Sequence, residues 1–219
     1  MRLFFALLAL PALPAMGAAQ IVNFDSAPVG SAPPGWTVAM THTGGAPKWV
    51  VLNDPTAPSQ PNVLAQTSND PADGRFPLAI LDRAGFRNGA VSVRCKAISG
   101  KVDQGAGLLW RYLDPNNYYL VRANALEDNV VLYKVQNGQR AAIAPKGTPA
   151  GTYGVNHKVP PKTWNAIRVT FNGPLFTVYF NGEKLFDAED SAFPSAGKVG
   201  LWTKADSVIY FDDFEAIEK

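Results

Sequence analysis

The chain has 219 residues, and its 20 Lys and Arg against 18 Asp and Glu leave a net charge of only +2 at neutral pH. No basic run interleaved with aromatic residues stands out, which argues against nucleic acid and anionic membranes as partners. The 19 glycines and 18 prolines suit many short strands joined by turns better than they suit a helical protein.

Residues 1–19 have the pattern of an export signal. Arg2 opens the segment, an apolar run extends over residues 3–13, and Ala18 and Ala19 are among the small residues that a signal peptidase needs. The run is too short to cross a bilayer as a helix. We therefore expect cleavage after Ala19 and a secreted or periplasmic protein without membrane insertion, whose residues 20–219 form a single domain.

Strand signals recur along the mature chain, and no convincing amphipathic helix is evident. Cys95 shares a face with Val91 and Val93, so we expect a buried and unreactive thiol. Asn181-Gly182 is typical of a type I′ turn between paired strands. These signals predict an all-β fold of two antiparallel sheets packed as a sandwich. Extended segments are predicted at residues 21–25, 48–52, 62–66, 77–81, 89–97, 164–171 and 175–180.

Residues 106–138 are the most informative segment, because their pattern predicts three consecutive antiparallel strands. Turns are predicted at residues 114–117 and 127–129, where Pro, Asn and Asp favour a tight reversal. If Leu113 pairs with Tyr118, alternation divides the first two strands into two faces. One face is apolar, with Leu108, Trp110, Tyr112, Tyr119, Val121 and Ala123, and the other is mixed, with Leu109, Arg111, Tyr118, Leu120, Arg122 and Asn124.

The mixed face is a candidate carbohydrate site. Guanidinium and amide groups set between apolar platforms offer the hydrogen bonds and stacking surfaces that a polyhydroxylated ligand needs. Arg and Asn on a strand are also commonly half-exposed or bonded to neighbouring backbone, so a structural role stays open. The candidate contacts are Arg111, Arg122, Asn124 and Tyr133, with Trp202 and Lys204 nearby.

Tryptophans are a second kind of candidate for contact with a sugar. The flat ring of Trp202 suits the C–H groups of a sugar, and Lys204 adds a donor at the rim. A Trp in a Gly-Leu-Trp strand is also commonly a core residue, so both roles remain open for Trp202. We assign Trp36, Trp49 and Trp164 to the core.

The last strand contains a break in its alternation. Phe211 and Phe214 are three residues apart, so both point inward only if a bulge intervenes at Asp212 and Asp213. Carboxylates at such a bend make a hard oxygen site, and Asp25 of the first strand is placed to join them, which makes structural calcium a candidate cofactor. The alternative is that one aspartate caps a backbone turn and the other is solvated.

The sequence offers weak support for ordinary glycoside hydrolysis, which needs two carboxylates roughly 5–9.5 Å apart. Residues 127–129 form a predicted turn, residues 187–190 a loop, and neighbours within 212–215 face opposite ways. The two histidines, His42 and His157, lie in loops rich in Thr, Gly or Pro. Catalysis by histidine, or a metal site built on it, therefore has little support, and no catalytic residue is named.

Six segments together carry a family resemblance: Phe24-Asp25, Pro61–Gln66, Tyr118–Asn129, Trp164–Val169, Gly200–Ser207 and Tyr210–Phe214. They resemble the 3-keto-disaccharide hydrolase-like family of the concanavalin A-like lectin and glucanase superfamily. The resemblance covers nearly all of the chain after the export signal. It implies a jelly-roll sandwich whose concave sheet handles carbohydrate, as a binding module or as a hydrolase or lyase of modified disaccharides.

Three functions follow as expectations. The first is a secreted jelly roll that binds a saccharide on its concave sheet. The second is an enzyme acting on 3-keto-disaccharides in the same groove, where the ketone acidifies the C2 proton so that elimination needs only one general base. The third is a structural envelope domain without a small ligand. An acidic pair at the groove would favour the enzyme, whereas an arginine and aromatic floor without one favours binding.

Overall fold

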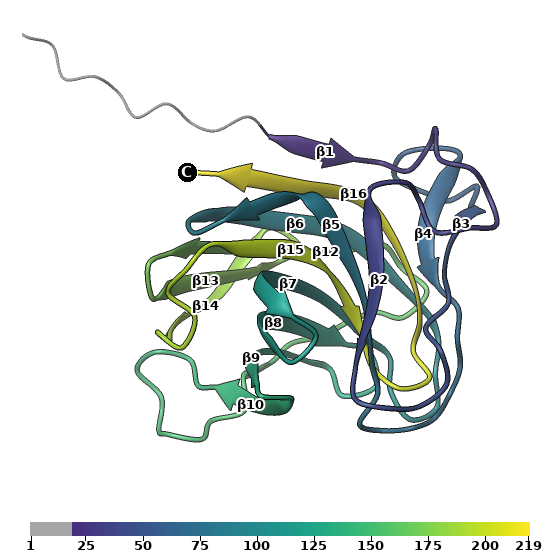
Figure 1. Ribbon diagram of the computed structural model, residues 1–219. Coiled ribbons are helices and arrows are strands. Elements are labelled where there is room, and N and C mark those ends of the chain that lie inside the picture. Colours follow the sequence, from purple (N-terminus) through teal and green to yellow (C-terminus); the bar gives the residue numbers. More distant parts are fainter. Residues whose placement is uncertain (1–18) are drawn as a thin grey trace, which may run out of the picture.

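The computed structural model describes residues 19–219, and all regular elements within that range are strands (Figure 1). The predicted export signal lies, except for Ala19, outside the described residues. No helix between residues 19 and 219 is long and apolar enough to span a membrane.

The strands form two eight-stranded antiparallel sheets, which confirms the predicted jelly-roll sandwich. The first sheet has the order β14 (Glu183–Glu189), β13 (Leu175–Phe180), β12 (Asn165–Asn172), β6 (Gly89–Ser99), β16 (Val208–Glu218), β4 (Asn62–Gln66) and β3 (Trp49–Asn53), with β1 (Gln20–Val22) paired to β16. The second has the order β10 (Gln139–Ile143), β9 (Asn129–Gln136), β8 (Asn117–Asn124), β7 (Gly105–Asp114), β15 (Gly197–Thr203), β5 (Phe76–Phe86) and β2 (Trp36–Thr41), with β11 (Val155–Asn156) paired to β9.

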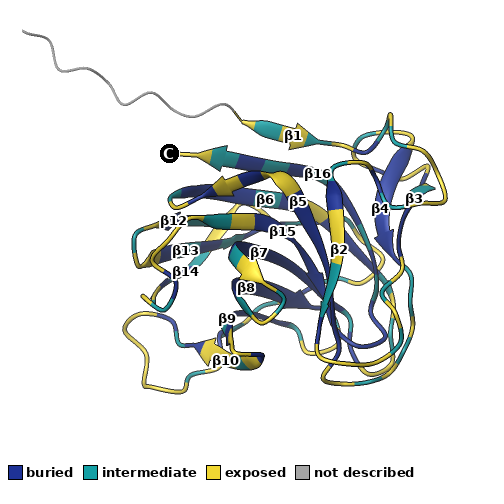
Figure 2. Ribbon diagram, viewed as in Figure 1, coloured by how far each residue is buried: buried dark blue, intermediate teal, exposed yellow. Residues whose placement is uncertain are grey.

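The main core lies between the two sheets, where period-two alternation turns every second side chain inward. Trp110 at its centre stacks on Tyr119 and Phe171, with ring centroids 5.6 and 5.8 Å apart. Cys95 is buried in this core as predicted, and its burial raises the pKa of the thiol to about 12. Buried residues run along the strands of both sheets (Figure 2).

The outer face of the second sheet is also apolar and buried, which is unusual for a sheet face that does not meet another sheet. Its side chains are at most 4% exposed, so side chains and loops must cover them. They are Phe76, Leu78, Ile80, Leu109, Tyr118, Leu120, Val131, Tyr133, Val135 and Trp202, which we call the aromatic floor.

The predicted pairing of Leu113 with Tyr118 is wrong. Trp110 pairs with Tyr119 and Asp114 pairs with Asn117, so residues 111–113 of β7 lie opposite Tyr118 alone. This bulge includes Arg111 with a left-handed φ of 48°. Because a bulge interrupts alternation, the Arg111 guanidinium lies against the core rings of Tyr119, Phe171 and Phe176, whereas Tyr112 packs on the aromatic floor.

The predicted bulge in the last strand is confirmed. Asp212 pairs with Arg94 and Glu215 with Ser92, which leaves one extra residue on β16, and Asp213 has a φ of 47°. The bulge lets both Phe211 and Phe214 point into the core at 0% exposure.

The core assignment of Trp164 is wrong, whereas those of Trp36 and Trp49 are confirmed. Trp164 is half-buried and alternates with Ala166 and Arg168, the outward-facing positions of β12. Its ring lies 4.8 Å from the Lys96 ammonium on the outer face of the first sheet. Strand alternation therefore outweighs hydrophobicity at this position.

Candidate functional site

Five of the six predicted carbohydrate contacts come together on the outer face of the second sheet. Arg122 and Asn124 come from β8, Tyr133 from β9, Trp202 from β15, and Lys204 follows β15 directly. Arg111 is the exception. Its guanidinium donates to the carbonyls of Arg87, Phe193 and Gly173, and so ties loops together at the edge of the core.

Two glycines on β7 make room for this site. Gly107 lies between Arg122 and Trp202 in neighbouring strands, and a Cβ there would approach Val121 O to 3.0 Å and the Trp202 Cβ to 3.2 Å. A Cβ at Gly105 would lie 2.9 Å from Asp103 Oδ1 and 3.1 Å from Arg122 Cδ. A side chain at Gly107 would press on Trp202, and one at Gly105 would press on Asp103 and Arg122.

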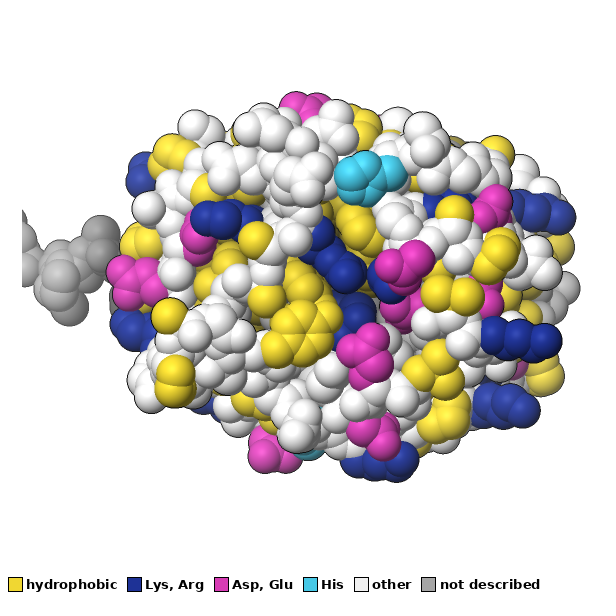
Figure 3. All heavy atoms as spheres, turned by 90° about the horizontal axis from the view of Figure 1, so that it is seen from below, with side chains coloured by type: hydrophobic (Ala, Val, Ile, Leu, Met, Phe, Trp, Pro, Cys, Tyr) yellow, Lys and Arg dark blue, Asp and Glu magenta, His cyan; other side chains and the backbone are white. Residues whose placement is uncertain are grey.

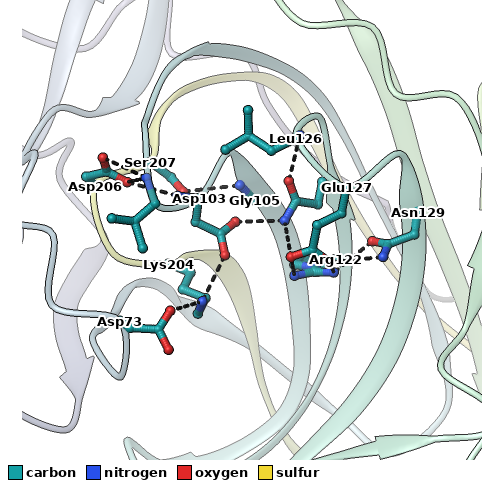
Figure 4. Close-up of polar contacts among 12 residues, drawn as sticks. Asp73, Asp103, Gly105, Arg122, Leu126, Glu127, Asn129, Lys204, Asp206 and Ser207 are labelled. Atoms are coloured by element: carbon teal, nitrogen blue, oxygen red, sulfur yellow. Dashed lines mark hydrogen bonds and ion pairs between the residues drawn. The ribbon is translucent and has the colours of Figure 1, made fainter.

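Glu127 is the centre of the first part of the network (Figure 4). Arg122 donates to its two carboxylate oxygens at 3.3 and 2.8 Å and also to Asn129 Oδ1 at 2.7 Å. Asn124 and Asn129 donate to Glu127 at 3.0 and 2.9 Å. Glu127 lies in the β8–β9 turn, so the paired strand ends hold its carboxylate in one place.

Lys204 is the centre of the second part (Figure 4). Its ammonium donates to Asp73 and forms an ion pair with Asp103 at 3.0 Å. Asp103 also accepts a hydrogen bond from Asn124 Nδ2 at 2.9 Å, the same group that donates to Glu127. One amide therefore joins two carboxylates, and the tertiary structure supplies an acidic pair that no local sequence spacing revealed.

Asp206 explains how the loop before β7 is held. Its carboxylate accepts the backbone N–H groups of Lys101, Val102 and Asp103 at 2.6, 3.1 and 3.0 Å. Burial raises the pKa of Asp206, but these hydrogen bonds outweigh it and leave the pKa below its ordinary value. The polar segment after Trp202 thus positions Asp103 through its backbone.

The pKa values of the two linked carboxylates, Asp103 and Glu127, are shifted in opposite directions. Burial raises the pKa of Asp103, and the nearby Arg122 and Lys204 only partly offset this effect. Burial also raises the pKa of Glu127, but the hydrogen bonds from Arg122 and Asn129 outweigh it, so this pKa lies below its ordinary value. Two neighbouring acids whose pKa values are pushed apart are typical of sites that separate a proton donor from an acceptor.

Arg140 and Tyr153 complete the site. The Arg140 guanidinium lies over the rings of Tyr133 at 4.6 Å, Phe76 at 5.0 Å and Trp202 at 5.8 Å. The Tyr153 hydroxyl forms a hydrogen bond with that of Tyr133, and Tyr153 as a residue is 48% exposed. Figure 3 shows Lys and Arg atoms within a hollow on this side of the molecule, with acidic and hydrophobic side chains at its rim.

Exposure separates the groups that a ligand can reach from those that support them. The Arg122 side chain is only 1% exposed, whereas Glu127 is 41% and Asp73 76% exposed. Asn124 and Trp202 are buried at 0%. In this structure Arg122, Asn124 and Trp202 therefore position other groups, and their direct contact with a ligand stays a prediction.

The sequence reasoning missed Glu127, Asp73, Asp103, Arg140 and Tyr153. A signal existed for Arg140, because the hairpin from β9 to β10 pairs it with Val135 and so sets it on the face of Tyr133. Glu127 was treated only as a turn residue, although the turn joins Asn124 to Asn129. Asp73, Asp103 and Tyr153 lie in loops, where alternation gives no information.

Cavities also lie on the outer face of the first sheet. Two of them, of about 330 and 570 Å³, share Ser92 and Ala166 as lining residues. There Ser92 donates to Glu215 at 3.2 Å, but the lining lacks the linked acids and buried cations found on the second sheet. We therefore place the candidate site on the second sheet.

Calcium at Asp25, Asp212 and Asp213 stays a prediction. Ser59 lies between two of these aspartates, because its hydroxyl donates to Asp25 and its N–H donates to Asp212 at 2.8 Å. Within residues 19–219 no three acidic, His or Cys side chains gather so as to hold a metal ion. If calcium does bind there, it should raise the melting temperature and a chelator should lower it.

In the absence of metal, the protonation of Asp212 in this bulge should make the stability of the protein depend on pH. Burial, with the nearby Asp213 and Asp25, raises the pKa of Asp212 to about 6, against about 3.9 in an unfolded chain. The folded protein then binds the proton more tightly, so Asp212 contributes stability that is complete below about pH 4 and is lost as pH rises through about 6. We expect this contribution to rise by about 1 kcal/mol from pH 7.5 to 5, after allowance for partial hydration.

Melting curves of the wild type and Asp212→Asn, with a chelator present, measure this contribution. The wild type should gain melting temperature from pH 7.5 to 5, and the variant should gain less. Equal gains would show that Asp212 does not titrate in this range.

Comparisons with known proteins identify the family and the fold. Residues 26–216 match the model of the 3-keto-alpha-glucoside-1,2-lyase-like domain. A comparison with curated protein sequences found no match.

Solved structures share the fold. The carbohydrate binding module CBM66 from Bacillus subtilis has a TM-score of 0.60 at 22% identity and covers 83% of this chain and 94% of its own. Domain 4 of AbnA, a GH43 extracellular arabinanase from Geobacillus stearothermophilus solved with arabinotriose, has a TM-score of 0.54 at 14% identity over 93% and 92%. A cellulose induced protein has a TM-score of 0.61 at 12% identity over 90% and 96%.

At these identities the solved structures establish the sandwich fold alone. The family model extends over most of the strands, from the loop after β1 to β16, and so includes every side chain of the candidate site. This match confirms the resemblance found in the sequence, and the chain belongs to the 3-keto-alpha-glucoside-1,2-lyase-like domain family.

Proposed function

We propose that the protein binds a carbohydrate on the outer face of the second sheet and that it is exported to do so. The observation that carries the proposal is the half-exposed Tyr153 ring beside fixed charged groups. Two proteins of the same fold support it, because one is described as a carbohydrate binding module and the other was solved with arabinotriose. The pattern of an export signal in residues 1–19 supports the proposed location.

The site has the two components that sugar recognition requires. An exposed aromatic ring offers a flat surface for the C–H groups of a pyranose or furanose ring. Carboxylate and guanidinium groups, held by their neighbours before the ligand arrives, supply hydrogen bonds to hydroxyls at a low cost in conformational entropy. Glu127 meets this requirement, because four hydrogen bonds already hold its carboxylate.

Tyr153→Ala tests the binding site. We expect about a tenfold loss of affinity, equal to about 1.4 kcal/mol, for any saccharide that the wild type binds in a titration panel. Tyr179→Ala is the matched control, because Tyr179 is half-buried on the outer face of the first sheet. Equal losses in both variants, or a loss only at Tyr179, would place binding elsewhere.

A second candidate function is elimination from a 3-keto-glucoside. It is favoured by the linked Asp103 and Glu127 and by the family name. In this reaction a carboxylate takes the C2 proton next to the ketone, the C–H electron pair forms the C1–C2 double bond, and the C1–O bond breaks. The departing oxygen then takes a proton. Glu127 is the carboxylate placed to act as the base, because Asp103 is only 1% exposed.

Glu127→Gln tests this second candidate. With a 3-keto-disaccharide as substrate we expect the rate to fall by about 10²–10⁴, the usual contribution of a general base. Binding of the same sugar should change by less than about tenfold, because the amide keeps the shape of the side chain. If the wild type binds the sugar but does not turn it over, the enzymatic function is contradicted and the binding function still holds.

A further inference from the structure

The cations of the candidate site are not equally neutralised. Arg122 forms an ion pair with Glu127, and Lys204 forms ion pairs with Asp73 and Asp103. No ion pair of Arg140 occurs among residues 19–219. Arg140 is therefore the cation on this face that forms no ion pair among the described residues, although its charge, after that of Lys204, helps to lower the pKa of Asp73.

Arg140 also has an unused donor in a place that water does not reach. Its Nη1 is buried without a hydrogen-bond partner among the described residues. Rings of the aromatic floor lie beneath the guanidinium, with Tyr133 at 4.6 Å and Phe76 at 5.0 Å. A buried donor without a partner costs free energy, and a ligand oxygen that accepts a hydrogen bond from it would remove that cost.

A second unused donor lies near the same ring. Arg122 Nε is buried and unpartnered, although its two terminal nitrogens are bonded. The Arg122 guanidinium is 5.7 Å from the Tyr133 ring, which Arg140 also contacts. Two guanidinium groups thus share one aromatic neighbour, and the hydroxyl of that neighbour bonds the exposed Tyr153.

Building on the proposed function, we infer that the saccharide bound here carries a carboxylate, as a uronic acid does, and that Arg140 pairs with it. A carboxylate presents two oxygens in one plane, which matches the fork of a guanidinium. Its single charge is balanced by Arg140 alone. A phosphate ester, with a charge near −2, would leave an excess of negative charge beside Glu127 and Asp73.

The location of Tyr153 fits this inference. The half-exposed ring is joined through Tyr133 to the surface that Arg140 covers. A sugar ring stacked on Tyr153 would therefore have its substituents close to Arg140. The aromatic rings cover one side of the partly exposed guanidinium and its Nη1 is buried, so water screens its attraction to an anion less than at the open surface.

Titration calorimetry with matched sugars tests the inference. The probes are oligogalacturonate and oligomannuronate, each paired with its methyl ester, which removes the charge but keeps the ring. We expect at least one acid to bind ten or more times more tightly than its ester at low salt, with the preference decreasing as salt is added. Arg140→Gln should reduce that preference to less than about threefold, and Arg140→Lys should keep part of it.

Arg168→Gln is the control, because Arg168 lies on the outer face of the first sheet, and it should keep the full preference. Neutral sugars that bind while the acids bind no better than their esters would overturn the inference and leave the proposed function standing. A preference for acids that survives Arg140→Gln would also overturn it. If neither acids, esters nor neutral oligosaccharides bind, the proposed function fails together with the inference.

Discussion

Replacing Arg122 with alanine is expected to lower the free energy of unfolding by about 3 kcal/mol. The Arg122 side chain is 1% exposed and donates to Glu127 and Asn129. Its removal leaves a cavity and takes from Glu127 the cation that holds the pKa of this carboxyl low. Breaking a buried ion pair costs about 3–5 kcal/mol, and the lower end applies because Glu127 stays in contact with water.

Denaturant unfolding of Arg122→Ala measures this loss, with Arg94→Ala as the control. Arg94 is exposed on β6, so its removal should change stability by less than about 0.5 kcal/mol. An Arg122→Ala protein with unchanged stability but weakened sugar binding would show that Arg122 contacts the ligand directly, as its position in the sequence predicts.

Replacing Arg111 with alanine is expected to cost still more, about 4 kcal/mol, or about 10 °C in melting temperature. The guanidinium donates to the carbonyls of Arg87, Phe193 and Gly173, which belong to three separate loops. Without it the buried carbonyl of Phe193 and the partly buried carbonyls of Arg87 and Gly173 lose their partners. Arg111→Lys should also destabilise the protein, because one ammonium does not reproduce the fork that spans three loops.

Arg87→Ala is the matched control for Arg111. Its side chain is exposed, and only its backbone carbonyl takes part in the contact, so the variant should melt within about 2 °C of the wild type. Equal melting temperatures for Arg111→Ala and Arg87→Ala would contradict a clamping role for the guanidinium.

Much of the fold could be predicted because strand alternation is local. Period-two patterns predicted strands over most of the chain, the buried Cys95, and the division of β8 into a core face and a mixed face. The phase break between Phe211 and Phe214 also predicted the bulge in β16, since two aromatic residues three apart cannot both point inward in a regular strand.

The same reasoning failed where a local signal was weak. No Gly or Pro at residues 111–113 signals the bulge in the sequence. Arg111 has a φ of 48°, and its guanidinium donates to carbonyls in loops distant in sequence. Trp164 was assigned to the core from its hydrophobicity, although the alternation of β12 turns it outward.

For the candidate site, alternation along β8 was enough to predict that Arg122 and Asn124 lie on one mixed face, and Tyr133 of β9 was predicted as a further contact. Which of these groups meets solvent depends on long-range packing: Arg122 and Asn124 are buried at 1% and 0% exposure. The acids that partner them come from loops, with Asp103 before β7 and Asp73 before β5. Their positions depend on long-range contacts, because the direction of a loop side chain is set by what the loop packs against and has no fixed period in the sequence.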